Sequence, residues 1–229
     1  MPTRFYLPNT GTAPITPAFA ADWELSAVAT RVPISTSKSN TTVAAVIYEM
    51  TSLTDKDSLI RQGISQPLAA QTIAAQTLSF VVKVIETTVS NDQFTAIGVR
   101  VVSNDGSVVR GTVLAVTRDD LEQSAASYTS RLLTATTTEV IVEANDRLVI
   151  EIGSGGLPGV VTDAGALRIG DDSADDLPAL DSGGALNDNP WVEFANVITF
   201  AALGAFSAPS TQKLKKTPIS AANIMDFNL

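Results

Sequence analysis

Asn104-Asp105-Gly106 lies between two runs of alternating, β-branched residues, Thr95–Ser103 and Ser107–Thr117. An Asp-Gly pair accepts the positive φ angles of a type I′ turn, and the twist of that turn matches the twist of paired strands. The first run carries its large aliphatic side chains on one parity, as a strand with one buried face does. This stretch therefore predicts a β-hairpin, and it indicates a fold built from antiparallel strands.

Short β runs and turn residues recur along most of the chain. The run Val43–Met50 is mostly apolar, which is typical of a central strand. Leu78, Phe80, Val82 and Val84 share one parity and can line one face of another strand. Further strands are expected near residues 5–7 and at 23–31, 59–65, 138–143, 147–152 and 191–200, with a second hairpin turn at Asn145-Asp146.

Two segments depart from this pattern. Asp119–Ala126 is the only segment with a helical pattern, since two aspartates could begin a short helix at the positive end of its dipole; a polar loop is the alternative. Gly153–Pro190 is rich in Gly and Asp and is expected to be mostly loop, with one short strand at 166–169. Strand number and spacing predict an all-β fold, an antiparallel β-sandwich of jelly-roll type with extended N- and C-terminal arms.

The chain of 229 residues contains no cysteine and no histidine. Disulfides, zinc–thiolate sites, Cys nucleophiles and all His-dependent catalytic or metal sites are therefore excluded. Glu86, Glu143, Glu151 and Glu193 lie on expected strands, where outward alternation explains them better than the carboxylate pair of a glycoside hydrolase. From these absences we expect a protein that is not an enzyme.

The chain is acidic, with a formal net charge of −9. A protein of this charge is repelled by phosphate backbones, so we expect no nucleic-acid partner. No run approaches the roughly 20 apolar residues of a membrane span, and the N-terminus lacks the apolar core of a signal peptide. We therefore expect synthesis in a host cytoplasm and no membrane partner.

Four carboxylates crowd into one glycine-rich stretch: Asp171, Asp172, Asp175 and Asp176. Calcium prefers several oxygen ligands at close range, and acidic loops can supply them. The spacing does not follow the EF-hand pattern, so the main expectation is a solvated acidic loop without a cofactor. A calcium site at these residues is the alternative.

Aromatic residues are few, and each tryptophan, Trp23 and Trp191, is expected at the beginning of a strand. Carbohydrate-binding sandwiches stack sugars on exposed aromatic rings. Packing in the core or at strand ends explains these aromatics better. Glycan binding is therefore the alternative interpretation.

Three parts follow from the pattern: an N-terminal extended arm at 1–22, a β-sandwich domain at 23–206 and a C-terminal tail at 207–229. The tail ends in an apolar tip, and an isolated monomer has little reason to keep such a tip on a tail. We expect it to dock on a neighbouring chain, adding a strand to a sheet edge; packing back on its own domain is the alternative. The expected docking residues are Ile224, Met225, Phe227 and Leu229, with Lys213, Lys215 and Lys216 facing an acidic neighbour.

Several stretches together resemble proteins encoded among the structural genes of tailed phages and prophages. They are Thr3–Pro8, Gly98–Gly106, Asp146–Gly153, Leu167–Asp171 and Pro190–Phe194. None of them is a catalytic motif, and the tail after residue 206 lies outside the resemblance. The resemblance implies a virion component with a β-sandwich body, of the capsid decoration or tail accessory type.

The residues and the resemblance together predict a bacteriophage structural protein, located in the virion. We expect it to form homo-oligomers and to bind other virion proteins, such as capsid or tail proteins, through its sandwich surface and terminal arms. The alternative is a carbohydrate-binding adhesin or receptor-binding module, which would use calcium in the acidic loop.

Overall fold

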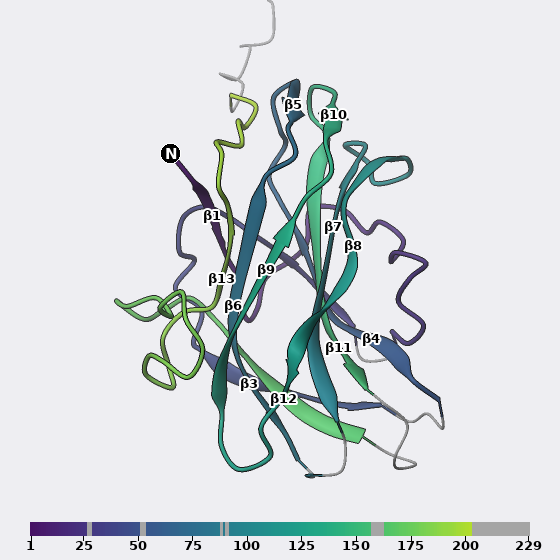
Figure 1. The fold of residues 1–229 in the computed structure, drawn as a ribbon. Coiled ribbons are helices and arrows are strands. Elements are labelled where there is room, and N and C mark those ends of the chain that lie inside the picture. The colour runs from purple at the N-terminus through teal and green to yellow at the C-terminus, as the bar shows by residue number, and fades with distance from the viewer. Residues whose placement is uncertain (27–28, 51–53, 88, 90–91, 157–162, 203–229) are drawn as a thin grey trace, which may run out of the picture.

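The computed structural model describes residues 1–202 apart from 27–28, 51–53, 88, 90–91 and 157–162 (Figure 1). These residues form thirteen β-strands and no helix. Accordingly, the described part of the chain contains no helix that is long and apolar enough to cross a membrane. The all-β prediction is confirmed, and the short helix predicted at 119–126 is wrong.

The first layer is a six-stranded sheet around β6 (Thr77–Glu86). One side of β6 pairs with β9 (Thr129–Thr136). The other side pairs with β13 (Trp191–Phe194) along its first half and with β12 (Asp163–Ile169) along its second half. Beyond these two strands lie β1 (Thr3–Tyr6), which pairs with β13, and β3 (Ala44–Met50), which pairs with β12.

The second layer is a five-stranded sheet in the order β2-β4-β11-β7-β8. Its strands are β2 (Thr30–Pro33), β4 (Lys56–Ile64), β11 (Arg147–Gly156), β7 (Gln93–Val102) and β8 (Val109–Glu122). All neighbours are antiparallel except β2 and β4, which run parallel. A separate pair joins β5 (Gln71–Ile73) to β10 (Val140–Val142).

Alternate side chains of both sheets point inward and form one core. The two sheets are therefore the layers of a β-sandwich (Figure 1). Strand β6 contributes the predicted set Leu78, Phe80, Val82 and Val84, all fully buried. Facing strands contribute the predicted one-sided sets Ile97, Val99 and Val101 from β7 and Leu148, Ile150 and Ile152 from β11. The β-sandwich is therefore confirmed, whereas a jelly-roll connectivity is not established by this strand order.

The hairpin at Asn104-Asp105-Gly106 is confirmed, since β7 and β8 pair directly across it. Gly106 has a φ of 80° but Asp105 has no positive φ, so the turn is not the expected type I′. The second predicted hairpin is wrong. The chain does turn at Asn145, which has a φ of 73°. However, β11 pairs with β4 and β7, and β10 leaves the turn to pair with β5. A turn residue determines where the chain reverses, but the packing of both faces decides which strands pair.

Residues 1–22, expected as an arm, lie against their own domain. After β1, the chain crosses the outer face of the five-stranded sheet with residues 13–23, here called the covering segment. Ala13 and Ile15 pack on one apolar patch of that face. Trp23 packs on a second patch, together with Phe19 and Ala20. Both faces of the central strands in this sheet are thereby buried.

Gly153 lies where the covering segment approaches the sheet most closely. A Cβ at this position would overlap the backbone oxygen of Ser58 and come within 2.6 Å of the Trp23 ring. We expect Gly153→Ala to lower the free energy of unfolding by about 1–3 kcal/mol or more, because backbone atoms have little room to move. Urea unfolding measures this. Gly98→Ala is the control, since its nearest neighbour is a Val116 methyl group at 3.2 Å; equal effects of the two substitutions would contradict the expectation.

Candidate functional site

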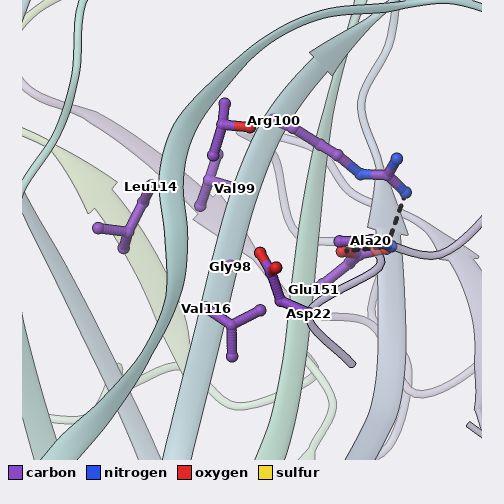
Figure 2. Close-up of a pocket in the computed structure, with 9 residues that line it drawn as sticks. Ala20, Asp22, Gly98, Val99, Arg100, Leu114, Val116 and Glu151 are labelled. Carbon is purple, nitrogen blue, oxygen red and sulfur yellow. Dashed lines mark hydrogen bonds and ion pairs between the residues drawn. The ribbon is translucent and has the colours of Figure 1, made fainter. Parts of the chain in front are cut away.

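A small pocket lies between the covering segment and the outer face of the five-stranded sheet (Figure 2). Its volume of about 20 Å³ is enough for one water molecule and far too small for an organic substrate. The residues that line it are Ala20, Asp22, Gly98, Val99, Arg100, Thr112, Leu114, Val116 and Glu151.

Glu151 is the buried carboxylate of this pocket and is only 1% exposed. Strand alternation on β11 places it on the outer face, as predicted, but the covering segment removes it from solvent. It accepts hydrogen bonds from Arg100 Nη2 at 2.9 Å, Gln62 Nε2 at 2.8 Å and Trp23 Nε1 at 3.1 Å, and from the Ala20 backbone N–H at 3.2 Å. All four donors come from the chain itself, so this carboxylate ties the covering segment to the sheet.

Arg100 is the cation of the pair and is 6% exposed. Its Nη2 also donates to the carbonyl oxygen of Ala18 in the covering segment. Its Nε finds no acceptor among the described residues, and the pocket beside it has room for a single bridging water. Figure 2 shows the Arg100 side chain extending toward Glu151 and Ala20. The arrangement is that of a buried structural ion pair.

A second polar cluster closes one end of the core. The inward-facing series of β6 continues past Val84 to Glu86, which is 1% exposed. Tyr48 Oη donates to Gln93 Oε1 at 2.6 Å, and Gln123 Nε2 donates to Ser154 Oγ at 3.3 Å. The backbone N–H of Gln93 donates to Glu86 Oε2 at 3.2 Å. Polar side chains from both sheets thus replace the apolar core at this end.

Burial raises the pKa of Glu86 from 4.5 to about 7, and the nearby carboxylates of Glu122 and Asp92 add to the shift. The hydrogen bond from the Gln93 backbone opposes the shift but does not cancel it. Glu86 therefore exchanges its proton near neutral pH, as carboxyl groups in functional sites and in buried structural networks do. Glu86 was expected on an outward face, but its side chain points into the core.

An open depression of about 440 Å³ lies beside β10 and the start of β8. Its cation, Arg110, already contacts Glu143 at 2.6 Å and Asp146 at 3.2 Å. The other lining residues are Gly111, Thr112, Thr138, Glu139, Val140 and Ile141. Because Arg110 is already paired within the chain, its charge is not available to a ligand in this depression.

Three of the four aspartates predicted as calcium ligands bond separate groups of the chain. Asp171 accepts hydrogen bonds from the backbone N–H groups of Ser39 and Thr41, and Asp172 accepts one from Val43.

Asp176 contacts Arg4 at 3.0 Å and Lys38 at 2.9 Å. Burial favours its neutral form, but hydrogen bonds from Asn189 and Lys38 outweigh burial and hold the pKa of Asp176 below its ordinary value. The side chain of Asp175 is exposed. In the described ranges no group of three or more acidic side chains is placed to hold a metal ion, so the predicted ligands do not converge.

The two tryptophans are buried, with Trp23 6% and Trp191 1% exposed. Trp191 Nε1 donates to the carbonyl oxygen of Leu177 at 2.7 Å, and Arg4 lies 3.9 Å from the centre of its ring. Neither ring offers an exposed face to a sugar.

The residues predicted to dock the C-terminal tail lie outside the described residues. They are Ile224, Met225, Phe227, Leu229, Lys213, Lys215 and Lys216.

Strand β3 is the surface feature that the sequence analysis placed wrongly. Its apolar run predicted a central strand, but β3 lies at the end of the six-stranded sheet and pairs only with β12 in the described part of the chain. Ile47 in its middle is 72% exposed. Over seven residues, Ala44–Met50, the strand carries one charge, Glu49, and no proline.

The other outer strands are protected in ways that edge strands commonly are. Strand β2 has four residues and ends in Pro33. Strand β8 has several register shifts and charged residues such as Arg118 and Asp119. Strand β1 has four residues, and Tyr6 at its end bridges to Ser35. Strand β9 has eight residues and one charge, but its outer side is bonded by the loop, since Leu132 N–H donates to Asp181 Oδ1 and Ser182 N–H to the Ser130 carbonyl oxygen. By comparison, β3 is seven residues long, carries one charge and has no proline or register shift in the described part of the chain.

No family model matches the chain, and no curated protein matches it. Solved structures of similar fold include an α-amino acid ester hydrolase, with a TM-score of 0.46 and 7% identity over 84% of this chain and 36% of that chain. A CocE/NonD family hydrolase from Staphylococcus aureus matches with a TM-score of 0.36 and 10% identity over 87% of this chain and 36% of that chain. The VP2 subviral particle of infectious bursal disease virus matches with a TM-score of 0.23 and 14% identity over 81% of this chain and 43% of that chain.

The chain spans 36% of the length of each of these hydrolases. At these identities the likeness concerns the β fold and transfers no activity, substrate or partner. The expectation that the chain is not an enzyme is nevertheless corrected, because the matched structures include hydrolases. The missing histidine and cysteine restrict the available chemistry but do not exclude catalysis.

Proposed function

We propose that this chain is a structural component of a tailed-phage virion, of the capsid decoration or tail accessory type, which assembles through the free edge of β3. The observation that carries the proposal is that, among the described residues, β3 pairs only with β12, exposes Ile47 and has neither proline nor bulge on its outer side. An exposed sheet edge presents a row of unpaired N–H and C=O groups to another chain. A protein that remained a monomer would be expected to blunt such an edge with charge, proline or a bulge.

Two further features support a role in assembly. The stretches that resemble phage structural proteins include β1, the β7 hairpin and β11, which belong to the body of the sandwich. The buried ion pair between Arg100 and Glu151 ties the covering segment to the sheet, so this body is stabilised without disulfides. Binding at many equivalent positions on a particle would stabilise it further by mass action.

The test is incorporation of the full chain into virus particles purified from the cells that encode it. We expect the wild-type chain to sediment with particles at many copies, and Ile47→Lys to reduce incorporation at least about tenfold, because a charge on the edge strand opposes strand pairing. Quantitative mass spectrometry of the particles measures both.

Ile141→Lys is the matched control, because Ile141 also lies in a strand and is 73% exposed. It should be incorporated like the wild type. Absence of the wild-type chain from purified particles, while it is present in the lysate, would contradict the virion proposal. Equal loss of both variants would contradict the assignment to β3.

A further inference from the structure

We propose that β3 pairs antiparallel with β3 of a second copy of this chain, about a twofold axis at Ile47. This inference rests on the proposed function, because it names the partner of the same edge. The pairing would join two six-stranded sheets into one continuous sheet. Three observations carry it: the direction of the free backbone groups, the position of Ile47 within the strand, and the placement of the single charge.

The hydrogen bonds of β12 determine which groups of β3 are free. The backbone N–H of Thr87, next to β6, donates to the carbonyl oxygen of Ala164 at 2.9 Å. Ala164 therefore directs its backbone groups toward β6 and forms a non-hydrogen-bonded pair with Glu49, its partner in β3. Because these pairs alternate along antiparallel strands, Ala45, Ile47 and Glu49 all direct their N–H and C=O groups toward the open edge.

The register follows from the length of the strand. Ile47 is the middle residue of Ala44–Met50, so a twofold axis at Ile47 overlaps the two strands over their full length. In this register Ile47 faces its twin, and Ala45 faces Glu49 of the second copy. All the outward backbone groups of these residues find partners, as a closed twofold interface requires.

The placement of the Glu49 and Ile47 side chains also favours a twofold axis at Ile47. An axis at Glu49 would place two carboxylates directly opposite each other, which is unfavourable. An axis at Ile47 instead places the most exposed aliphatic side chain of the strand against its twin and separates the two glutamates. The net charge of −9 on each copy still opposes association at long range. We therefore expect dimerisation to strengthen with salt, which screens that repulsion without weakening backbone hydrogen bonds.

The experiment uses the absence of cysteine from the chain. In the full chain Ile47→Cys introduces a single thiol, and hydrogen-bonded antiparallel partners have Cα atoms about 5.5 Å apart, which suits a disulfide. We expect a covalent dimer under mild oxidation. Because pairing holds the thiols at a millimolar effective concentration, cross-linking at about 10 μM protein should be roughly 100-fold faster than for the equally exposed control Ile141→Cys.

The register has its own test. A mixture of Ala45→Cys and Glu49→Cys should cross-link to a mixed dimer much faster than either variant alone, because only the mixture brings the two positions opposite each other.

Cross-linking of Ile47→Cys at the same slow rate as Ile141→Cys would overturn the inference. If cross-linking failed but Ile47→Lys still reduced incorporation into particles, the proposed function would stand. The partner of β3 would then be a strand of another virion protein in place of a second copy. If incorporation were also unaffected, both proposals would fail.

Discussion

Glu151→Ala is expected to lower the free energy of unfolding by about 3–5 kcal/mol, because it leaves the buried Arg100 guanidinium without its carboxylate. The side chains of Arg100 and Glu151 are only 8% and 1% exposed, and they meet at 2.9 Å. The substitution also removes the acceptor of the Trp23 indole N–H and of the Ala20 backbone. Urea unfolding followed by circular dichroism measures the loss. Limited proteolysis should find new cleavage within residues 13–23, which lose their attachment to the sheet.

Glu143→Ala is the matched control. Glu143 forms a shorter contact, 2.6 Å to Arg110, but its side chain is 64% exposed, and exposed ion pairs contribute only about 0–1 kcal/mol. The double variant Arg100→Met with Glu151→Leu should recover most of the stability, since apolar pairs often replace buried ion pairs without loss. If Glu151→Ala cost no more than Glu143→Ala, the buried pair would not be what holds the covering segment.

Glu86→Gln is expected to remove most of the pH dependence of stability between about pH 5 and 8. The pKa of Glu86 is raised from 4.5 to about 7 by burial and by the nearby carboxylates of Glu122 and Asp92. The native state therefore binds this proton more tightly than the unfolded chain. Its contribution to stability is complete below pH 4.5 and is lost as the pH rises to about 7. The loss amounts to roughly 3–4 kcal/mol, at about 1.4 kcal/mol per pKa unit.

The composition makes this experiment unusually direct. Histidine is the side chain that ordinarily titrates in this range, and the chain has none. Melting temperatures from pH 5 to 8 should fall for the wild type and for the exposed control Glu139→Gln. They should stay nearly level for Glu86→Gln, which should also be the more stable variant at pH 8. A slope shared by all three proteins would show that Glu86 does not titrate in this window.

Side-chain alternation was the most informative part of the sequence. It identified the inward-facing sets of β6, β7 and β11, because a strand's side chains alternate whatever its partners are. The Asp-Gly turn was equally reliable, because its positive φ angle is a local requirement that few residues meet. The second turn predicted a hairpin that does not form, since the flanking segments find better partners in β4, β5 and β7.

Burial of single polar residues was predicted less well. Alternation correctly placed Glu151 on the outer face of its strand, yet that face is covered by residues distant in sequence. Glu86 follows the parity of Val84 and continues the inner face, so the alternation itself held a signal that was missed. The buried Arg100–Glu151 pair had no signal in the sequence, because its two members are 51 positions apart and meet only through strand pairing.

By itself the sequence determined the all-β class, the inward faces of the main strands, the position of the β7–β8 turn and the chemistry that missing histidine and cysteine exclude. These properties are local or compositional, so they do not depend on which strands meet. Only the tertiary structure decided that the apolar run Ala44–Met50 is an edge, that the four aspartates of the acidic loop do not converge and that Glu86 is buried. Each of these depends on strand order and on coverage of the sheets, which arise from packing between segments far apart in the chain.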